Sequence, residues 1–287
     1  MTHSKIQPVS VVSISGSVLI YGPPGVGKTW LIGSAPKPIL VLDAESGIRT
    51  LQGVPGVFTW AIDSFADAVE AGKYLRANPK EFKSVAVDTL NELQAKIQED
   101  VQGTKPKPSI QDYGEIKDKT ERIVRAFRDL PVHFIATCHE AIERDEEGAV
   151  VKRRPMMVGS IKENLGRFFD IVGMLQMKEQ KDASGEMELV RKLIVQAGPT
   201  WEAKDRTGTY QLFAPLDLTE MLSKALAFNV DEELDAPTGF PAPEQIDIPG
   251  HPIASVKDDD WPWQCSCGEG FKTEAAAKHH AMMGGQK

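Results

Sequence analysis

The feature that most constrains the fold is a glycine-rich segment between two different local patterns. It reads Gly22-Pro23-Pro24-Gly25-Val26-Gly27-Lys28-Thr29 and is followed by Trp30. Before it, residues 17–21 form a short apolar run of β-forming residues, and after it residues 28–34 can form a helix. Glycines let backbone N–H groups curl around an anion, and the helix N-terminus adds its positive end. The segment therefore predicts a phosphate-binding loop between a strand and a helix.

The residues of this loop have separate expected roles. Lys28 is placed to reach the β- and γ-phosphate oxygens of a nucleoside triphosphate, and the Thr29 hydroxyl is placed on Mg²⁺. The remaining residues from Gly22 to Trp30 are expected to line the phosphates. ATP and Mg²⁺ are therefore the expected cofactors. The structural alternative is a Gly/Pro turn that happens to precede a lysine.

Size and composition limit the class of protein. A chain of 287 residues can bury one α/β core of about 200 residues with a smaller part attached. No apolar stretch is long enough to cross a bilayer and no N-terminal signal sequence is present, so a soluble, cytoplasmic protein without a membrane partner is expected. Cys138 lies in an apolar run, and Cys265 and Cys267 are one residue apart. This usage suits a reducing compartment and a metal site better than a disulfide framework.

The acidic residues are concentrated in one segment. Residues 229–260 hold nine acidic residues and a single lysine, which accounts for the whole net charge of −8. The segment also contains five prolines and has neither hydrophobic period, so it is interpreted as an extended acidic linker. Three regions follow: an ATPase domain over 1–228, the linker over 229–260 and a small module over 261–287.

Apolar runs alternate with helical patterns before the linker, which indicates the fold class. The expected strands are 17–21, 38–42, 57–61, 83–87, 132–137, 170–177 and 188–196, and the expected helices are 28–34, 64–77, 89–101, 112–129, 160–167 and 217–227. This alternation predicts an α/β fold with a mostly parallel central sheet flanked by helices. Ligands bind at the carboxyl ends of such strands. A polar turn between the last two strands predicts a hairpin.

Two expected strands end in carboxylates at the edge where the loop lies. Residues 84–87 lead into Asp88, which is placed to hold Mg²⁺ through water, although Asp88-Thr89 could instead cap the following helix. Asp43-Ala44-Glu45 follows the strand next in the chain after the loop. A carboxylate there points into the cleft of Lys28 and could orient the attacking water. Capping of a turn by Asp43 or Glu45 is an equally good interpretation of these residues alone.

Together, the loop, the Asp43-Ala44-Glu45 strand and the Asp88 strand resemble the core of RecA-like ATPases. The resemblance implies that Glu45 is the catalytic glutamate. Residues 134–140 look like the strand whose terminal polar residue senses the γ-phosphate, with His139 or Glu140 in place of the usual glutamine. Trp201 to Gly208 is similar to the basic stretch that reaches the nucleotide of a neighbouring subunit. This similarity implies that Lys204 or Arg206 contacts the γ-phosphate bound by a neighbouring subunit. The protein would then be a homo-oligomer, a ring or a filament, with nucleotide at the subunit interface. The alternative is that these residues form a solvated basic turn.

Residues from about 15 to 227 look most like the small RecA-like ATPases of phages known as the Sak group, which promote single-strand annealing in recombination. By this resemblance two mobile loops bind single-stranded DNA. The corresponding segments are Gly103 to Pro108 and Glu143 to Gly159, both basic and marked by glycine or proline. Clustered basic residues on flexible loops suit sequence-independent contact with phosphates, but solvated surface loops are an equal alternative. Their basic residues are Lys105 and Lys107 in the first loop and Lys152, Arg153 and Arg154 in the second.

The C-terminal residues 261–287 resemble a shortened zinc finger. Cys265, Cys267, His279 and His280 are the candidate Zn²⁺ ligands, and residues 274–282 form an alanine-rich helical stretch. The cysteines are closer together than in the usual finger, and adjacent histidines point about 100° apart on a helix. A piece of this size hardly folds without metal, which favours zinc over a helical tag in which aromatic residues pack together.

The sequence thus predicts an ATP-dependent, single-stranded-DNA-binding recombination protein, active in the host cytoplasm if a phage encodes it. Two alternatives stay open. The first is a small-molecule kinase, for which Arg122, Arg125 and Arg128 are the candidate lid arginines. The second is an ATP-gated adaptor that uses the acidic linker to recruit replication or recombination proteins, with a single-strand-binding protein as a candidate partner.

Overall fold

In the computed structural model of the chain, the described residues are 15–181 and 184–226, together with the backbone of three short strands at 253–255, 263–265 and 270–271. The chain divides into two units, Met1–Phe228 and Asn229–Lys287. The first unit contains the glycine-rich loop and the carboxylates singled out above.

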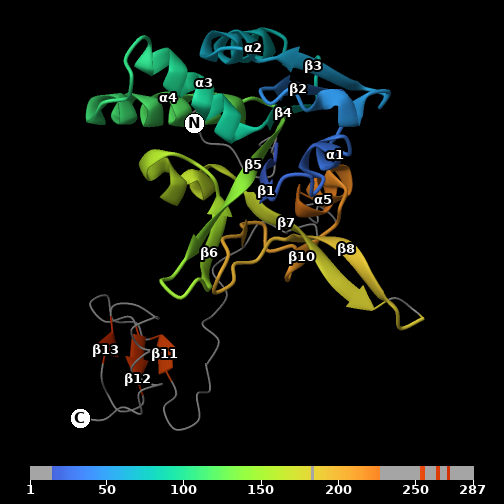
Figure 1. The fold of residues 1–287 in the computed structure, drawn as a ribbon. Helices are drawn as coiled ribbons and strands as arrows, with labels where there is room; N and C mark the ends of the chain where they lie inside the picture. Colours follow the sequence, from blue (N-terminus) through green and yellow to red (C-terminus); the bar gives the residue numbers. More distant parts are fainter. Residues whose placement is uncertain (1–14, 182–183, 227–252, 256–262, 266–269, 272–287) are drawn as a thin grey trace, which may run out of the picture. The chain divides into compact units, whose positions relative to one another are not determined.

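A central sheet of ten strands organises the first unit (Figure 1). Its main order is β10-β8-β7-β1-β5-β4-β2-β3, with β6 paired to β5 and β9 paired to β7. The strands are β1 Ser17–Gly22, β2 Ile39–Asp43, β3 Val57–Ala61, β4 Ser84–Asp88, β5 His133–Arg144, β6 Val150–Pro155, β7 Ile171–Lys181, β8 Met187–Ile194, β9 Lys204–Asp205 and β10 Phe213–Ala214. The pairs from β3 to β7 along this order are all parallel. The predicted mostly parallel sheet is therefore confirmed.

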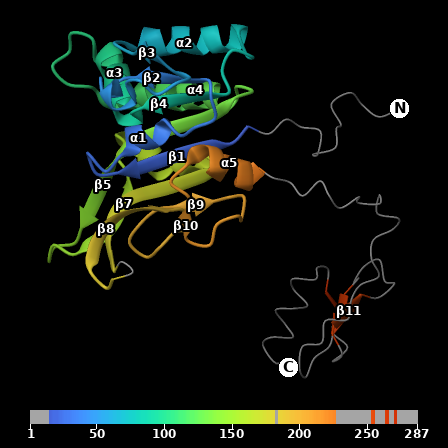
Figure 2. The ribbon, with the colours of Figure 1, turned by 90° about the vertical axis from the view of Figure 1, so that its right-hand side faces the viewer.

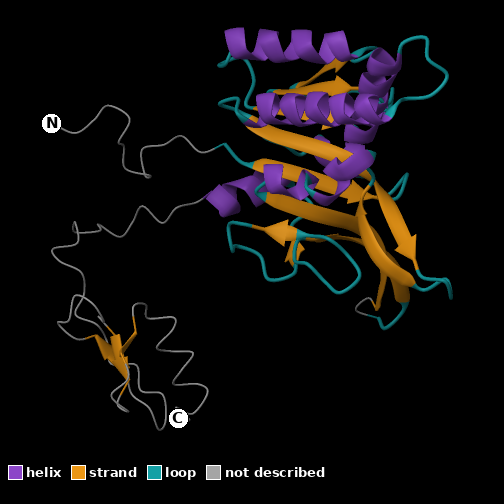
Figure 3. Ribbon diagram, turned by 90° about the vertical axis from the view of Figure 1, so that its left-hand side faces the viewer, coloured by secondary structure: helices purple, strands orange, loops and turns teal. Residues whose placement is uncertain are grey.

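Helices cover both faces of the sheet (Figure 3). They are α1 Lys28–Ile32, α2 Phe65–Ala77, α3 Leu90–Gln102, α4 Ile110–Arg128 and α5 Leu218–Leu226. Val18 and Ile20 of β1 pack with α1 and α5, which lie next to β1 in Figure 2. Leu19 and Tyr21 point the other way, toward the core under α2, α3 and α4. Because successive side chains of a strand alternate between faces, one short apolar run supplies both cores.

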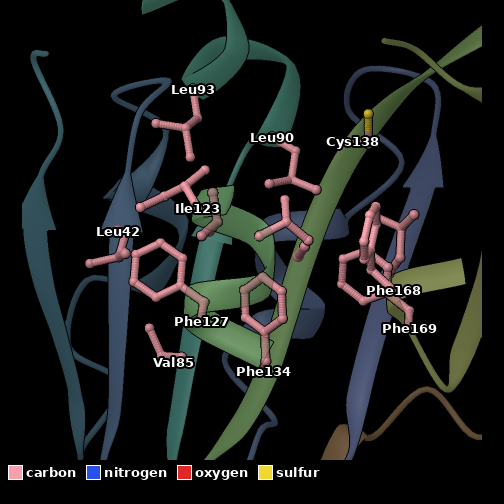
Figure 4. Close-up of a cluster of buried hydrophobic side chains, with 14 of the residues drawn as sticks. Leu42, Val85, Leu90, Leu93, Ile123, Phe127, Phe134, Cys138, Phe168 and Phe169 are labelled. Atoms are coloured by element: carbon pink, nitrogen blue, oxygen red, sulfur yellow. The ribbon is translucent and has the colours of Figure 1, made fainter. Parts of the chain in front are cut away.

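The larger core contains a row of stacked aromatic rings (Figure 4). Phe134 of β5 stacks on Phe127 of α4 at a centroid distance of 5.9 Å and on Phe169 at 5.4 Å. All three side chains are fully buried. A buried aromatic side chain of this kind contributes about 1.5–3 kcal/mol by transfer from water alone. This row fixes α4 and the segment before β7 on β5, the strand that later enters the nucleotide site.

Polar residues at the helix starts explain where the helices begin. Ser64 with Asp67 and Ser109 with Asp112 form capping boxes at α2 and α4. The Thr89 hydroxyl accepts a hydrogen bond from the Glu92 N–H at the start of α3. The cap of α3 is therefore Thr89, which leaves the Asp88 carboxylate for other partners.

Two expectations about the elements are wrong. Residues 160–167 do not form an α-helix but two short 3₁₀ helices, η3 Gly159–Glu163 and η4 Leu165–Phe168. Asn164 and Gly166, both poor helix formers, interrupt the segment. Residues 143–159 are not a loop either, because they contain the end of β5, a turn, and strand β6 paired antiparallel to it. The predicted hairpin of the last two strands is confirmed, since β7 and β8 pair antiparallel from Met174↔Ile194 to Lys181↔Met187.

The second unit contains a small antiparallel sheet. Its strands are β11 Ile253–Ser255, β12 Trp263–Cys265 and β13 Gly270–Phe271, in the order β11-β12-β13. The predicted helical stretch 274–282 lies outside the described residues, as do Cys267, His279 and His280. The division into two units falls between Phe228 and Asn229.

Candidate nucleotide-binding site

The glycine-rich loop connects the end of β1 to the start of α1, and two of its glycines are required by the geometry. A Cβ on Gly22 would lie 2.2 Å from the Leu175 carbonyl oxygen of β7, so any larger residue collides with backbone. Gly27, directly before α1, has φ 104°, a left-handed conformation that favours glycine. These constraints let the loop fold tightly against β7 and bring Lys28 back over the end of β1.

The Lys28 ammonium lies at the centre of the site. It donates hydrogen bonds to the carbonyl oxygens of Gly22 and Pro23, both at 3.0 Å, and lies 3.4 Å from His139 Nδ1. Burial lowers the pKa of Lys28, and the nearby Glu45 and Asp88 carboxylates partly offset this effect. The ammonium is held by backbone carbonyls that an incoming phosphate can replace.

Asp88, at the end of β4, accepts hydrogen bonds from the loop and from β5. Its Oδ2 accepts a hydrogen bond from Thr29 Oγ1 at 2.7 Å, and its Oδ1 accepts one from the Thr137 hydroxyl of β5. The oxygen-only pair of a threonine hydroxyl and a carboxylate fits Mg²⁺, which uses one or two protein oxygens together with phosphate oxygens and waters. Thr29 and Asp88 would hold the ion, and Mg²⁺ would neutralise phosphate charge there.

Glu45, which follows β2, contacts the nitrogen of the His139 ring that does not face Lys28. Its Oε1 lies 3.2 Å from His139 Nε2, so the His139 ring bridges Glu45 and Lys28. The backbone N–H of His139 donates to Asn91 Oδ1 at 3.1 Å, which fixes this part of β5. Asp43 instead accepts a hydrogen bond from the Gly47 N–H at 3.2 Å and caps the turn. The two carboxylates of Asp43-Ala44-Glu45 therefore have different surroundings, and Glu45 is the one that faces Lys28.

A cavity of about 440 Å³ lies over these residues. It is lined by Pro24, Gly25, Gly27, Lys28, Thr29, Trp30, Glu45, Gly47, Thr50, His139 and Arg191. Gly22 at the end of β1 pairs with His139 of β5, and Asp43 of β2 pairs with Asp88 of β4, so one edge of the sheet brings these elements together. The structure thus gathers Lys28, Thr29, Glu45, Asp88 and His139 in one place.

Arg191 of β8, Gly47 and Thr50 line the cavity but were not predicted from the sequence, and Arg191 is the charged residue among them. Its Nε donates a hydrogen bond to the Val26 carbonyl oxygen of the loop at 2.9 Å. The available signal was a basic residue between Leu189 and Leu193 on one face of an expected strand. That signal could not be used without knowing that β8 pairs with β7 beside the loop.

Lys204 and Arg206 do not line this cavity. Strand β9 pairs with Ile171 and Val172 at the start of β7, whereas the loop follows the end of β1. Lys204 Nζ donates to the Gly166 carbonyl oxygen at 2.6 Å, and burial together with neighbouring Arg206 lowers its pKa. Arg206 pairs with Asp170 at 3.3 Å. Both residues lie at the opposite end of the strands from the phosphate loop of their own chain.

The second predicted DNA loop is a structured hairpin with its charges paired, which corrects the expectation of an open basic loop. The salt bridges are Lys152–Glu202 at 2.8 Å, Arg153–Glu140 at 3.0 Å, and Arg154–Glu143. The acids lie across the β5–β6 pair or in the segment before β9, where the sequence separation hides them. Glu140 therefore pairs with Arg153, whereas His139 lines the nucleotide cavity.

The first predicted DNA loop does connect two helices, α3 and α4. Lys105 within it forms a salt bridge of 2.8 Å with Asp112, while Lys107 is exposed. The Lys105 ammonium and the Ser109 N–H lower the pKa of the Asp112 carboxyl to about 2. One of the two lysines is thus used in closing the loop at the start of α4.

The predicted zinc ligands fall almost entirely outside the described residues. Cys265 lies at the end of β12, and the side chains of this segment are not described. Within residues 15–181 and 184–226, no group of three or more histidine, cysteine, aspartate or glutamate side chains is arranged to hold a metal ion. Zinc binding therefore remains a prediction for the second unit.

Comparison with known families agrees with the geometry of the site. Residues 15–207 match the sequence profile of an AAA domain family. The chain belongs to this AAA domain family. The match covers the loop, all the strands that end at the cavity, and β8 with Arg191. No curated protein matches the chain.

Family membership and the site together establish a nucleotide-binding P-loop NTPase of the AAA and RecA-like type. Such a domain binds nucleotide, typically with Mg²⁺. Lys28 and Glu45 both line the cavity, and each contacts one nitrogen of the His139 ring. Among the helices that the structure describes, none is long and apolar enough to span a membrane.

Proposed function

We propose that this AAA-family ATPase binds single-stranded DNA in its ATP-bound state and promotes annealing or pairing of strands. In this proposal it is a homo-oligomeric recombination protein of the cytoplasm, similar to the phage RecA-like ATPases of the Sak group. The observation that supports the proposal is the course of β5, which passes from the nucleotide site directly into the basic β5–β6 hairpin.

The coupling runs through two adjacent residues of β5. His139 contacts Lys28 and Glu45, so the ring must respond when a γ-phosphate enters between them. The next residue, Glu140, holds Arg153 of β6 at 3.0 Å. A small shift of β5 at His139 therefore changes the salt bridge of the hairpin.

Release of the hairpin charges gives DNA a binding surface. Each of Lys152, Arg153 and Arg154 pairs with a glutamate. The Lys152–Glu202 pair is exposed, and exposed pairs of this kind contribute about 0–1 kcal/mol, whereas the side chains of Arg154 and Glu140 are largely buried. A phosphate backbone can replace Glu202 at little cost, and its counterions are released; Arg153 becomes available when the shift of β5 breaks its contact with Glu140. Val151, which directly precedes Lys152 and is 50% exposed, offers an apolar contact for a base.

The small-molecule kinase is less well supported. Arg125 pairs with Glu121 and Arg128 with Asp129 on α4, and neither they nor Arg122 line the nucleotide cavity. The arrangement of α4 therefore offers no arginine-rich lid over the phosphates. The ATP-gated adaptor differs from the recombination protein in having no DNA-stimulated turnover, and the experiment below separates the two.

The test is the ATPase rate of the full chain with and without single-stranded DNA of mixed sequence. We expect stimulation of about tenfold or more, together with DNA binding that weakens linearly with the logarithm of salt concentration. The double variant Lys152→Ala/Arg153→Ala should keep the basal rate and lose stimulation. Lys73→Ala, which changes an exposed lysine of α2, is the matched control.

Three results would count against the proposal. Nucleotide binding without DNA binding or stimulation favours the adaptor. Transfer of phosphate to a small-molecule acceptor favours the kinase. Equal stimulation of the hairpin variant and the Lys73→Ala control would move the DNA contact away from the β5–β6 hairpin.

A further inference from the structure

Arg191 is a basic side chain that lines the nucleotide cavity. It lies on β8 of the β7–β8 hairpin, opposite Met177, and its side chain is exposed. Its Nε holds the Val26 carbonyl oxygen at 2.9 Å, and its guanidinium carbon lies 5.9 Å from the centre of the Trp30 ring. A Cβ on Gly27 would lie 3.1 Å from the same Nε, so the arginine rests directly on the loop.

Strand alternation explains why this residue and not its neighbour reaches the loop. Leu193 is buried in the same core cluster as Val26, and Arg191 lies two residues earlier on the same face of β8. Lys192 points to the other face, where its ammonium lies 5.6 Å from the centre of the Phe213 ring. The hairpin thus directs one basic residue toward the nucleotide and the next one away from it.

The guanidinium has donors left for a ligand. Its Nε is used by Val26, and among the described residues no carboxylate forms an ion pair with its terminal nitrogens. Arg125, Arg153 and Arg167, by contrast, are each paired with a glutamate. A guanidinium that lines a cavity with a phosphate loop, without an acidic partner, is suited to bind phosphate oxygens through two parallel N–H groups.

The position of Arg191 selects which phosphates it can bind. Lys28, His139 and Glu45 contact one another on one side of the cavity, where the terminal phosphate is expected. Arg191 instead contacts Val26 and Trp30 and has no hydrogen bond with those three residues. The backbone N–H groups of a phosphate loop hold the α- and β-phosphates, while its lysine reaches the β- and γ-phosphates, so a residue that contacts the loop at Val26 and Trp30 is on the side of the α- and β-phosphates.

We propose that Arg191 binds the nucleotide in cis, donating its terminal N–H groups to α- or β-phosphate oxygens while its Nε holds the loop. The contact makes the β7–β8 hairpin part of the nucleotide site. It rests on the nucleotide binding established by the family and the loop, and it is independent of any action on DNA.

The experiment compares nucleotide affinity of full-length variants by isothermal titration calorimetry with Mg-ADP and a non-hydrolysable ATP analogue. Arg191→Ala is expected to weaken both nucleotides by the same factor, about 10- to 100-fold, the range of a hydrogen bond to a charged group. Lys192→Ala, the matched control on the opposite face, should stay within about twofold of the parent chain. Melting temperatures without nucleotide verify that both variants are folded before their affinities are compared.

Further variants separate phosphate contact from support of the loop. Arg191→Gln can still donate to Val26 but carries no charge, so the proposal expects it to bind nucleotide as weakly as Arg191→Ala; it also serves if the alanine variant does not fold. Nucleotide affinity equal to that of the parent chain in the glutamine variant would mean that Arg191 only supports the loop, through its hydrogen bond to Val26. Unchanged affinity in Arg191→Ala would overturn the proposal outright, and a loss confined to the ATP analogue would overturn the α- and β-phosphate assignment.

Discussion

At the scale of single residues, the site is a set of polar contacts that nucleotide must exchange for its own. Lys28 is held by two carbonyl oxygens, Thr29 by Asp88, and Glu45 by His139. Both hydrogen-bond acceptors of the Lys28 ammonium are uncharged carbonyl oxygens. Binding of a triphosphate therefore gives the Lys28 ammonium anionic phosphate oxygens in place of neutral carbonyl oxygens, which favours the bound state.

Substitution of Glu45 is expected to impair ATP turnover, whereas substitution of Lys28 is expected to impair nucleotide binding. Glu45→Gln keeps the size of the side chain but removes the base, so nucleotide affinity should stay within a few-fold while turnover falls by about 100-fold or more. Lys28→Ala removes the phosphate contact and should abolish binding. Calorimetry and phosphate release measure the two effects. ATP turnover at the parent rate in Glu45→Gln would remove Glu45 from the mechanism.

The lowered pKa of Lys28 gives nucleotide affinity a pH dependence. Phosphate binding requires the charged ammonium, which is fully present below that pKa and is lost as pH rises through it. ADP affinity should therefore decline at a lower pH than that at which an ordinary lysine loses its proton. Lys28→Arg, whose guanidinium stays charged, should remove the decline even if it binds more weakly overall. A parallel decline in both proteins would assign the titration to another group.

Local sequence was sufficient to predict that some of these residues lie in the nucleotide site, but not others. Lys28, Thr29 and Asp88 could be placed because each follows or ends a predicted strand, and carboxyl ends of parallel strands share one edge. The choice between Asp43 and Glu45 could be made only from the turn at Gly47, whose N–H donates its hydrogen bond to Asp43. The place of Arg191 in the site could not be predicted, because it depends on the pairing of a strand that lies more than 160 residues from the loop in the sequence.

At the scale of elements, the buried strands were predictable and the charged hairpin was not. Strands β1, β2 and β4 are short apolar runs with both faces covered, and such runs are visible in sequence. The β5–β6 hairpin instead carries alternating charges whose partners lie across the strand pair. Clustered basic residues therefore suggested an open loop, because the pairing acids could be identified only with the register.

Burial of β5 predicts an unreactive thiol at Cys138. The side chain is fully buried, and burial raises the pKa of its thiol to about 12. At pH 8 only about one thiol in ten thousand would be ionised. Native protein treated with a thiol reagent at this pH should leave Cys138 unlabelled, whereas denaturant should expose it. Mass spectrometry of the labelled peptide measures this, and rapid native labelling would show that β5 opens far more often than its packing implies.

At the scale of the whole molecule, the nucleotide site and the basic pair of β9 lie at opposite ends of the sheet. From Val18, the β1 partner of Ile171, to Gly22 is about 13 Å along β1 at 3.3 Å per residue. Lys204 and Arg206, held by Gly166 and Asp170, therefore act on no phosphate of their own chain. If they act on nucleotide at all, the phosphate belongs to a neighbouring copy, and each site is an interface between subunits.

Mixing two inactive variants tests this arrangement. Lys28→Ala lacks the loop contact but keeps β9, and Lys204→Ala/Arg206→Ala lacks the basic pair but keeps the loop. In a random one-to-one assembly, about a quarter of the interfaces join an intact loop to an intact basic pair, so about a quarter of parent ATPase activity should return. Lys28→Ala mixed with Glu45→Gln, both defective in the loop site, should recover none. No recovery in the first mixture, with mixed assembly verified by mass, would mean that Lys204 and Arg206 serve only their own fold through Gly166 and Asp170.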